Sequence, residues 1–113
     1  MSDCIFCKIA AKQIPARIVY EDPEIFAFED IQPQAPLHIL VCPRMHIESL
    51  TDTKDSDAAM LGKLLLIGSK LASERGHGTA HRSVFNTGAE AGQSVFHLHL
   101  HVLGGRPMRW PPG

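Results

Sequence analysis

The segment His97-Leu98-His99-Leu100-His101-Val102-Leu103 alternates histidine with aliphatic residues. Side chains alternate between the two faces of a β-strand, so this pattern predicts a strand with three imidazoles on one face and aliphatic side chains on the other. Successive positions on one face lie about 6.5 to 7 Å apart. Packing alone gives little reason to gather three titratable rings in this way. We therefore expect the aliphatic face to join a core and the histidine face to line a functional cavity.

The three imidazoles could act as nucleophile, as general acid or base, or as metal ligand. Histidines at positions i, i+2 and i+4 of one strand reach a single ion less easily than ligands from separate segments do. The segment itself leaves all three roles open, and we expect the roles to be divided among the rings.

The rest of the chain predicts an α+β protein with a mostly antiparallel sheet, because short strands precede and follow one long helix. A short helix over Cys4–Ala11 has Ser2 or Asp3 available as its N-cap. The long helix, Asp55–Glu74, carries an apolar stripe at Ala58, Leu61, Leu65, Gly68 and Leu71. The strands are expected at roughly Arg17–Glu21, Ile25–Asp30, Leu37–Cys42, Arg82–Asn86 and His97–Leu103.

Length and composition set the class of protein. The chain has 113 residues, and we expect residues 1–113 to form one domain. A hydrophobic fraction of 44% and a formal charge of −1 are typical of a globular protein and give no basic surface for nucleic acid as the main ligand. Three cysteines cannot all pair, and neither a signal peptide nor a membrane-length apolar run is present. These features predict a cytoplasmic protein without a membrane anchor.

The chain resembles the histidine triad superfamily, and within it the histidine triad nucleotide-binding (Hint) branch. The likeness rests on the His97–Leu103 segment, on its flanks Gly92–Phe96 and Gly104–Pro107, and on further ordered matches. These matches are Ile5–Ile9, Ile14–Ala16, Phe28–Ile31, Pro33–Pro36, Leu37–Val41 and Trp110–Gly113. The resemblance implies a five-stranded sheet with one long and one short helix. It also implies a homodimer in which two sheets join into one of ten strands, through the long helix and the strand after it.

The resemblance further implies hydrolysis of purine nucleoside 5′-phosphoramidates through a nucleotidyl-histidine intermediate. His99 is then the nucleophile, and the carbonyl of His97 holds the proton on its other ring nitrogen. His101 and His38 form the proton-handling pair beside it. Splitting one displacement into two steps is the usual advantage of covalent catalysis.

For the nucleotide, the resemblance implies that Asp30 accepts hydrogen bonds from the ribose hydroxyls. No cluster of Lys or Arg accompanies the histidines, so neutral donors are expected to meet the phosphoryl charge. These donors are Ser94, Asn86 and backbone N–H groups near Gly92, with Gln93 in the same loop. Trp110, on a tail formed by residues 105–113, is expected near the active site of the partner subunit. An apolar slot for the base, favouring purines by stacking area, is assigned to Ile5, Phe6, Ile9, Phe28, Ile31 and Leu40.

A zinc site is the expected cofactor site. Cys4-x-x-Cys7 is absent from the best-known Hint proteins but agrees with zinc-binding members of the superfamily, which implies the ligand set Cys4, Cys7, His46 and His97. Two thiolates and two imidazoles form a closed structural site. Redox use of the pair, or two ordinary thiols, are the alternatives.

Two other functions remain open at this point. A related enzyme could hydrolyse dinucleoside polyphosphates, although the ending Gly104–Gly113 argues against it. A nucleotide-binding interaction protein would use its dimer exterior rather than the histidines. For the dimer itself, Leu64, Ile67 and Leu71 of the long helix are the candidate contact.

Overall fold

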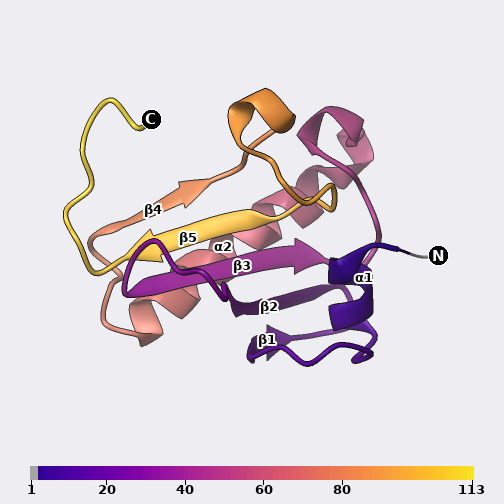
Figure 1. Cartoon of the computed structure of the whole chain (residues 1–113), viewed down its shortest axis with the longest axis horizontal. Helices are drawn as coiled ribbons and strands as arrows, with labels where there is room; N and C mark the ends of the chain where they lie inside the picture. Colours follow the sequence, from indigo (N-terminus) through magenta and orange to yellow (C-terminus); the bar gives the residue numbers. More distant parts are fainter. Residues whose placement is uncertain (1–2) are drawn as a thin grey trace.

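A five-stranded sheet forms the centre of the computed structural model, which describes residues 3–113 (Figure 1). The strand order is β1-β2-β3-β5-β4, and every neighbouring pair is antiparallel. This confirms the predicted α+β class. The strands are β1 (Ile18–Glu21), β2 (Ile25–Glu29), β3 (Leu37–Pro43), β4 (His81–Val84) and β5 (Leu100–Gly104).

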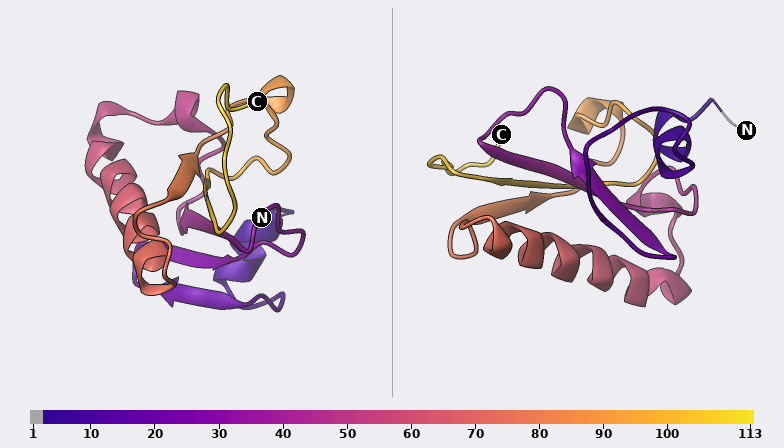
Figure 2. Two further views of the ribbon diagram at one scale, coloured as in Figure 1. Left: turned by 90° about the vertical axis from the view of Figure 1, so that its left-hand side faces the viewer. Right: turned by 90° about the horizontal axis from the view of Figure 1, so that it is seen from below.

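The two helices lie on opposite faces of this sheet (Figure 2). Helix α1 (Ile5–Ala10) covers one face and helix α2 (Ala58–Glu74) runs along the other. Three short 3₁₀ turns, η1 (Leu50–Asp52), η2 (Asp55–Asp57) and η3 (Ala89–Ala91), lie in the connections. Within residues 3–113, no helix has the length and hydrophobicity needed to span a bilayer.

The predicted apolar stripe of α2 was wrong in part. Leu71 and Gly68 do face the sheet, but Leu65 is 44% exposed and Ala58 is also exposed. The buried stripe shares Gly68 and Leu71 with the predicted one, and its other members are Met60, Leu64, Ile67 and Ala72.

The set proposed as a dimer contact is therefore also corrected. Leu64 is 0% exposed, Ile67 8% and Leu71 5%, because all three pack in the core between α2 and the sheet. The outward apolar residues of α2 are instead Leu65 and Leu66. Residues 64–67 of α2 are four consecutive apolar residues, so the sequence does not show which of them faces the sheet. The rotation of the helix is set by the close packing of Gly68 against β5.

Helix α1 begins differently from the prediction. Its N-cap is Cys4, whose Sγ accepts a hydrogen bond from the N–H of Cys7 at 3.3 Å. Asp3 lies before this cap, and Ser2 is outside the described residues. Phe6 and Ile9 of α1 pack onto the sheet in a second core cluster with Phe26, Phe28, Leu40 and Cys42.

The histidine segment is a strand only in its second half. β5 begins at Leu100, and the chain bends at Val95–His97 before it. There the N–H of Leu98 donates to the carbonyl of Ile47, outside the sheet ladder. The alternation still separates two faces, because Leu98, Leu100 and Val102 are buried on the α2 side. After this bend the His97 ring packs against Phe6 of α1, with ring centroids 5.9 Å apart.

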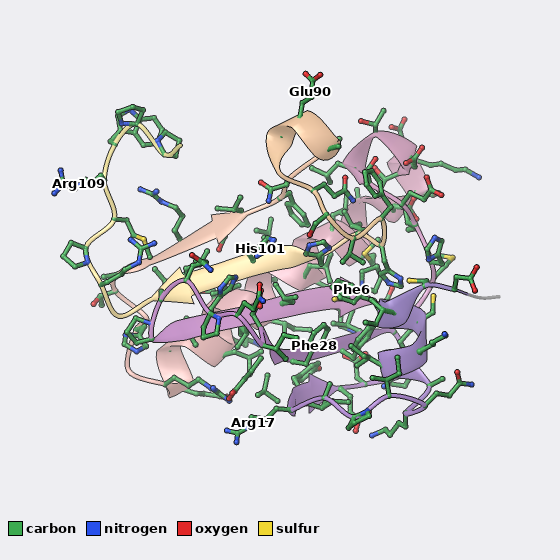
Figure 3. The ribbon with its side chains drawn as sticks, in the orientation of Figure 1. Phe6, Arg17, Phe28, Glu90, His101 and Arg109 are labelled. Carbon is green, nitrogen blue, oxygen red and sulfur yellow. The ribbon has the colours of Figure 1, made fainter. Side chains whose placement is uncertain are left out.

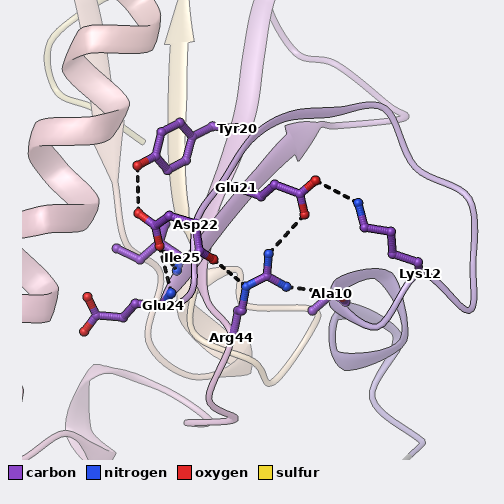
Figure 4. A network of polar contacts seen from close by, with 8 residues as sticks. All are labelled: Ala10, Lys12, Tyr20, Glu21, Asp22, Glu24, Ile25 and Arg44. Atoms are coloured by element: carbon purple, nitrogen blue, oxygen red, sulfur yellow. Dashed lines mark hydrogen bonds and ion pairs between the residues drawn. The ribbon is translucent and has the colours of Figure 1, made fainter.

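Arg44, just after β3, joins α1 to the sheet (Figure 4). Its guanidinium donates to the carbonyls of Ala10 and Asp22 and to the carboxylate of Glu21. Burial would raise the pKa of the Asp22 carboxyl, but hydrogen bonds from Tyr20 and from the following backbone N–H groups outweigh it and hold the pKa well below its usual range. This network fixes the position of α1, which supplies one wall of the site described next.

Candidate active site

His99 has one free ring nitrogen. Its Nδ1 lies 2.6 Å from the carbonyl oxygen of His97, and a carbonyl can only accept, so Nδ1 carries the proton. The Nε2 atom of the neutral ring then holds a lone pair. The side chain lines a cavity together with His101, whose ring centroid lies 4.9 Å from that of His99. His99 therefore presents an unprotonated nitrogen to that cavity.

His38 and His101 form a directed chain of hydrogen bonds. The backbone N–H of Gln34 donates to Nδ1 of His38 at 3.0 Å, so the proton of His38 is on Nε2. This Nε2 lies 2.9 Å from Nδ1 of His101, which must accept. The proton of His101 is consequently on its Nε2. A carboxylate oxygen of Asp30 lies 3.5 Å from Nε2 of His38. Asp30, His38 and His101 therefore lie close together, and the hydrogen bond between the two rings explains this grouping without a metal ion.

Burial lowers the pKa of all four of these histidines. At His97 and His99 the hydrogen bonds to backbone carbonyls oppose the effect of burial, and at His38 the Asp30 carboxylate does so. At His101 the neighbouring His99 and His38 add to burial and lower the pKa to about 4. The four rings are neutral at pH 7, which is the state that attacks an electrophile or binds a metal.

The cavity beside His99 and His101 has a volume of about 210 Å³. Phe6 packs edge-on against Phe28 and His99, with ring centroids 5.2 and 5.1 Å apart respectively. Figure 3 shows both phenylalanines on the same side of the sheet as His101. The structure brings all the residues assigned to the base slot, with Asp30 and Ser94, to this cavity. Its lining is Ile5, Phe6, Ile9, Ile14, Pro15, Ala16, Phe28, Asp30, Ile31, Leu40, Ser94, His99 and His101.

Three of these lining residues, Ile14, Pro15 and Ala16, were missed as site residues. They follow α1, and their likeness to the family in sequence assigned them no role. Proline and two small or branched apolar residues in a connecting segment carry no periodic pattern, so only the tertiary fold shows that they close the cavity.

The expected phosphate donors lie in different surroundings. The hydroxyl and N–H of Ser94 have no hydrogen-bond partner within residues 3–113, and Ser94 is exposed at the cavity. The N–H of Gly92 is not available, because it donates to the carbonyl of Ala89 at 3.0 Å. Gly92 instead serves the loop through its left-handed backbone, φ +98°, which only glycine adopts easily.

Gln93, Asn86 and Trp110 are not among the residues that line this cavity. The Gln93 amide is buried. Its Oε1 accepts a hydrogen bond from the N–H of Gly88, and its Nε2 donates to the carbonyls of Glu48 and Val95, so Gln93 holds the loop in place. Asn86 lines an adjacent groove that also contacts His38 and His101. Trp110 is 83% exposed on the C-terminal tail.

Cys4, the N-cap of α1, and Cys7 within the helix lie next to His46 and His97. Cys4 Sγ lies 3.3 Å from Nδ1 of His97, and Cys7 Sγ lies 3.4 Å from Nδ1 of His46. All four ligand atoms lie within 4.8 Å of one another. Nε2 of His97 donates to the carbonyl of Pro43 at 2.8 Å, which leaves Nδ1 unprotonated toward the thiols. The donor set and the tautomer both fit a tetrahedral metal site.

Residues 3–110 match the model of the protein family described as "Scavenger mRNA decapping enzyme C-term binding". The chain is 52% identical over 111 residues to an uncharacterised HIT-like protein of Synechocystis, covering 98% of this chain and 97% of that one. Among solved structures, it is similar to a HIT family hydrolase of Legionella pneumophila, with 49% identity, a TM-score of 0.96, and coverage of 98% and 100% of the two chains. A HIT family hydrolase of Clostridium thermocellum has 39% identity and a TM-score of 0.93, with 96% of each chain covered.

Proposed function

We propose that this chain, which belongs to the histidine triad (HIT) superfamily, is a purine nucleoside phosphoramidase that works through a nucleotidyl-histidine on His99. The observation that carries the proposal is the unprotonated Nε2 of His99 at the wall of an apolar cavity. Relatives named as HIT family hydrolases support hydrolysis in general.

In the first proposed step, Nε2 of His99 attacks the α-phosphorus and the P–N bond to the leaving amine breaks. The leaving nitrogen takes its proton from solvent, and the Nε2–H of His101, at the outer end of the hydrogen-bond chain that begins at Gln34, donates a hydrogen bond to it. The P–N bond then breaks and the neutral amine leaves. Water attacks phosphorus, the bond to His99 breaks, and the proton of the water passes to solvent. The products are a nucleoside monophosphate and an amine.

The other side chains bind the nucleotide in this proposal. The hydroxyl and N–H of Ser94 donate to phosphoryl oxygens, and Asp30 accepts the ribose hydroxyls. Phe6, Phe28 and Ile31 contact the base. The Ile31 side chain is 92% exposed in the free chain and would be covered by a bound base. Because the cavity wall is apolar, we expect stacking to favour purines, with weak discrimination between adenine and guanine.

We also propose that Cys4, Cys7, His46 and His97 hold a structural Zn²⁺. The ion would link the start of α1 to the bend before β5 through its ligands and would take no part in the reaction. Helix α1 has only six residues, a length that is marginal without such support.

A homodimer is proposed on two observations. Within residues 3–113, β4 is an edge strand of the sheet, and an edge strand offers backbone N–H and C=O groups for pairing with another chain. Leu66 of α2, 65% exposed, lies among the outward apolar residues. Pairing of two β4 strands would join the sheets into one of ten strands and bring each tail, with Trp110, toward the partner. Light scattering at micromolar concentration should give twice the chain mass, and Leu66→Glu should weaken the association.

The proposed activity is tested with adenosine 5′-phosphoramidate and, in parallel, a diadenosine polyphosphate. His99→Ala should abolish turnover of the phosphoramidate. His81→Ala is the matched control, because Nδ1 of His81 is bonded to the carbonyl of His77, away from the cavity. Full activity in His99→Ala would refute the covalent mechanism. Preferential turnover of the polyphosphate would replace the phosphoramidase by the related hydrolase, and nucleotide binding without turnover of either would favour an interaction protein.

A further inference from the structure

A second groove lies against the histidine pair on the side away from the base cavity. Its volume is about 270 Å³, and Gln34, His38, Arg82, Asn86, His101 and Arg106 are among the residues that line it. His101 is a wall of both this groove and the base cavity. The two hollows therefore meet at the residue whose Nε2–H is available for the reaction.

The two hollows differ in charge. Among the residues that the structure describes, the base cavity is lined by one carboxylate, Asp30, and by no Lys or Arg. The groove is lined by two arginines and by no acidic residue from the same part of the chain. Arg82 is carried by β4 opposite Leu103, and Arg106 follows β5 directly after Gly105. The sequence separates these arginines by 23 intervening residues, which hides the pairing that the sheet creates.

Both arginines are held by neutral partners. Arg82 Nη2 donates to the carbonyl of Arg109 at 2.7 Å, and Arg106 Nε donates to the carbonyl of Gln34 at 2.8 Å. Arg17, Arg44 and Arg75 all form ion pairs with glutamates, whereas Arg82 and Arg106 form none with any residue from 3 to 113. A guanidinium has five N–H donors, so each of the two keeps donors and an unneutralised charge for a ligand.

The chemistry requires a place for the leaving group. In a displacement at phosphorus the entering and leaving atoms are roughly in line, so the leaving group departs away from His99 and cannot share the slot of the base. We propose that the Arg82–Arg106 groove binds the leaving group and selects one that carries an anionic group, a carboxylate or a phosphate. This inference rests on the proposed function and adds the substrate class to it.

The test compares adenosine 5′-phosphoramidates in matched pairs. One pair has glycine or glycinamide as the leaving amine, and the other has 2-aminoethyl phosphate or 2-aminoethanol. The measured quantity is the ratio of kcat/KM for the charged substrate to that for its neutral partner. The amines differ in intrinsic reactivity, and this difference cancels when the ratio for a variant is compared with the ratio for the wild-type protein. The pair that shows the larger effect identifies the carboxylate or the phosphate as the preferred group.

Arg82→Gln and Arg106→Gln should each lower this ratio about 10-fold, because each removes a charge-assisted hydrogen bond. Arg82→Lys should retain part of the preference. Arg109→Gln is the control, since only the backbone carbonyl of Arg109 is used and its side chain points away from the sheet (Figure 3). In the wild-type protein the preference should also shrink at high salt, a measurement that needs no variant.

An unchanged ratio in both glutamine variants, or a wild-type ratio that does not respond to salt, would overturn the inference. A uniform loss on charged and neutral substrates would also overturn it, since the arginines would then bind the nucleotide itself. In each of these cases turnover of the glycinamide substrate still supports the proposed activity. Only the absence of turnover with every phosphoramidate would remove the proposed activity as well.

Discussion

Two glycines of α2 should respond in opposite directions to the same substitution. A Cβ added at Gly68 would lie 2.8 Å from Cγ2 of Val102 and 3.3 Å from Cδ2 of Leu100, both in β5. Carbon atoms prefer about 3.5 to 4.0 Å, and the β-branched side chain of Val102 has little freedom to turn aside. At Gly62 no atom of residues 3–113 beyond the helix's own nearby backbone lies within 4 Å of such a Cβ. Gly68→Ala should therefore overpack the core, and Gly62→Ala should not.

The magnitudes follow from these contacts. Overpacking costs about 1 to 3 kcal/mol, and alanine regains about 1 kcal/mol of helix propensity, so Gly68→Ala should lower the free energy of unfolding by about 1 kcal/mol. Gly62→Ala should raise it by about 0.5 to 1 kcal/mol through propensity alone. Because Leu100 and Val102 flank His101, a helix pushed outward by Gly68→Ala should also lower kcat/KM.

Urea denaturation measures the two free energies, and the midpoints should move in opposite directions at constant m-value. In a thermal melt the two variants should differ by roughly 6 to 8 °C, at about 4 °C for each kcal/mol in a chain of this size. Turnover of a phosphoramidate measures the effect on the site, with Gly62→Ala as the control of unchanged activity. A Gly68→Ala variant at least as stable as the wild-type protein would show that the reasoning about the α2–β5 contact is wrong.

Three further predictions concern the metal, the histidines and the ribose. Zinc at 100 times its Kd should stabilise the wild-type protein by about 2.7 kcal/mol in thermal melts, and Cys4→Ser should abolish the response; metal analysis that finds no zinc in the purified protein would contradict it. The pKa of His101 is about 4 in the folded chain and about 6.5 when unfolded, so the unfolded state binds the proton first and stability should fall from pH 6.5 toward pH 4. Because solvent screens this partly exposed ring, the loss should be about 1 to 2 kcal/mol. Urea titrations of the metal-free protein at several pH values should show this loss, and His101→Asn should reduce the slope. Asp30→Ala should weaken selection of ribose over 2′-deoxyribose substrates by about 10-fold or more, and an equal preference in both proteins would exclude the ribose contact.

The alternating histidine segment carried most of what could be predicted from sequence. Period-2 alternation predicted which face is core, and Leu98, Leu100 and Val102 are indeed buried. The alternation did not predict the bend before β5. Side chains continue to alternate along an extended segment even where its backbone no longer pairs with a neighbouring strand. Because of this bend, the His97 ring lies beside the cysteines while its carbonyl oxygen accepts the proton of His99.

Long-range contacts account for the other differences. In α2, Leu64, Leu65 and Leu66 are chemically alike, so sequence could not say which of them faces the sheet. The lack of a Lys or Arg cluster beside the histidines in the sequence predicted neutral donors at the site, yet the antiparallel pairing of β4 with β5 brings Arg82 and Arg106 to one groove. Ile14, Pro15 and Ala16 had no periodic signal. In each case the missing information is the register or the rotation of an element, which depends on packing between distant segments.

His97 has a ring and a backbone that face different neighbours. Its ring lies among Cys4, Cys7 and His46, and its carbonyl oxygen accepts the proton of His99. A side-chain substitution at position 97 removes the first contact and leaves the second chemically intact. Any loss of turnover in such a variant would thus measure how far the peptide group at position 97 drifts once its anchor is gone. Replacing the 97–98 amide by an ester, which weakens that carbonyl as an acceptor but keeps the ring, would separate the two effects.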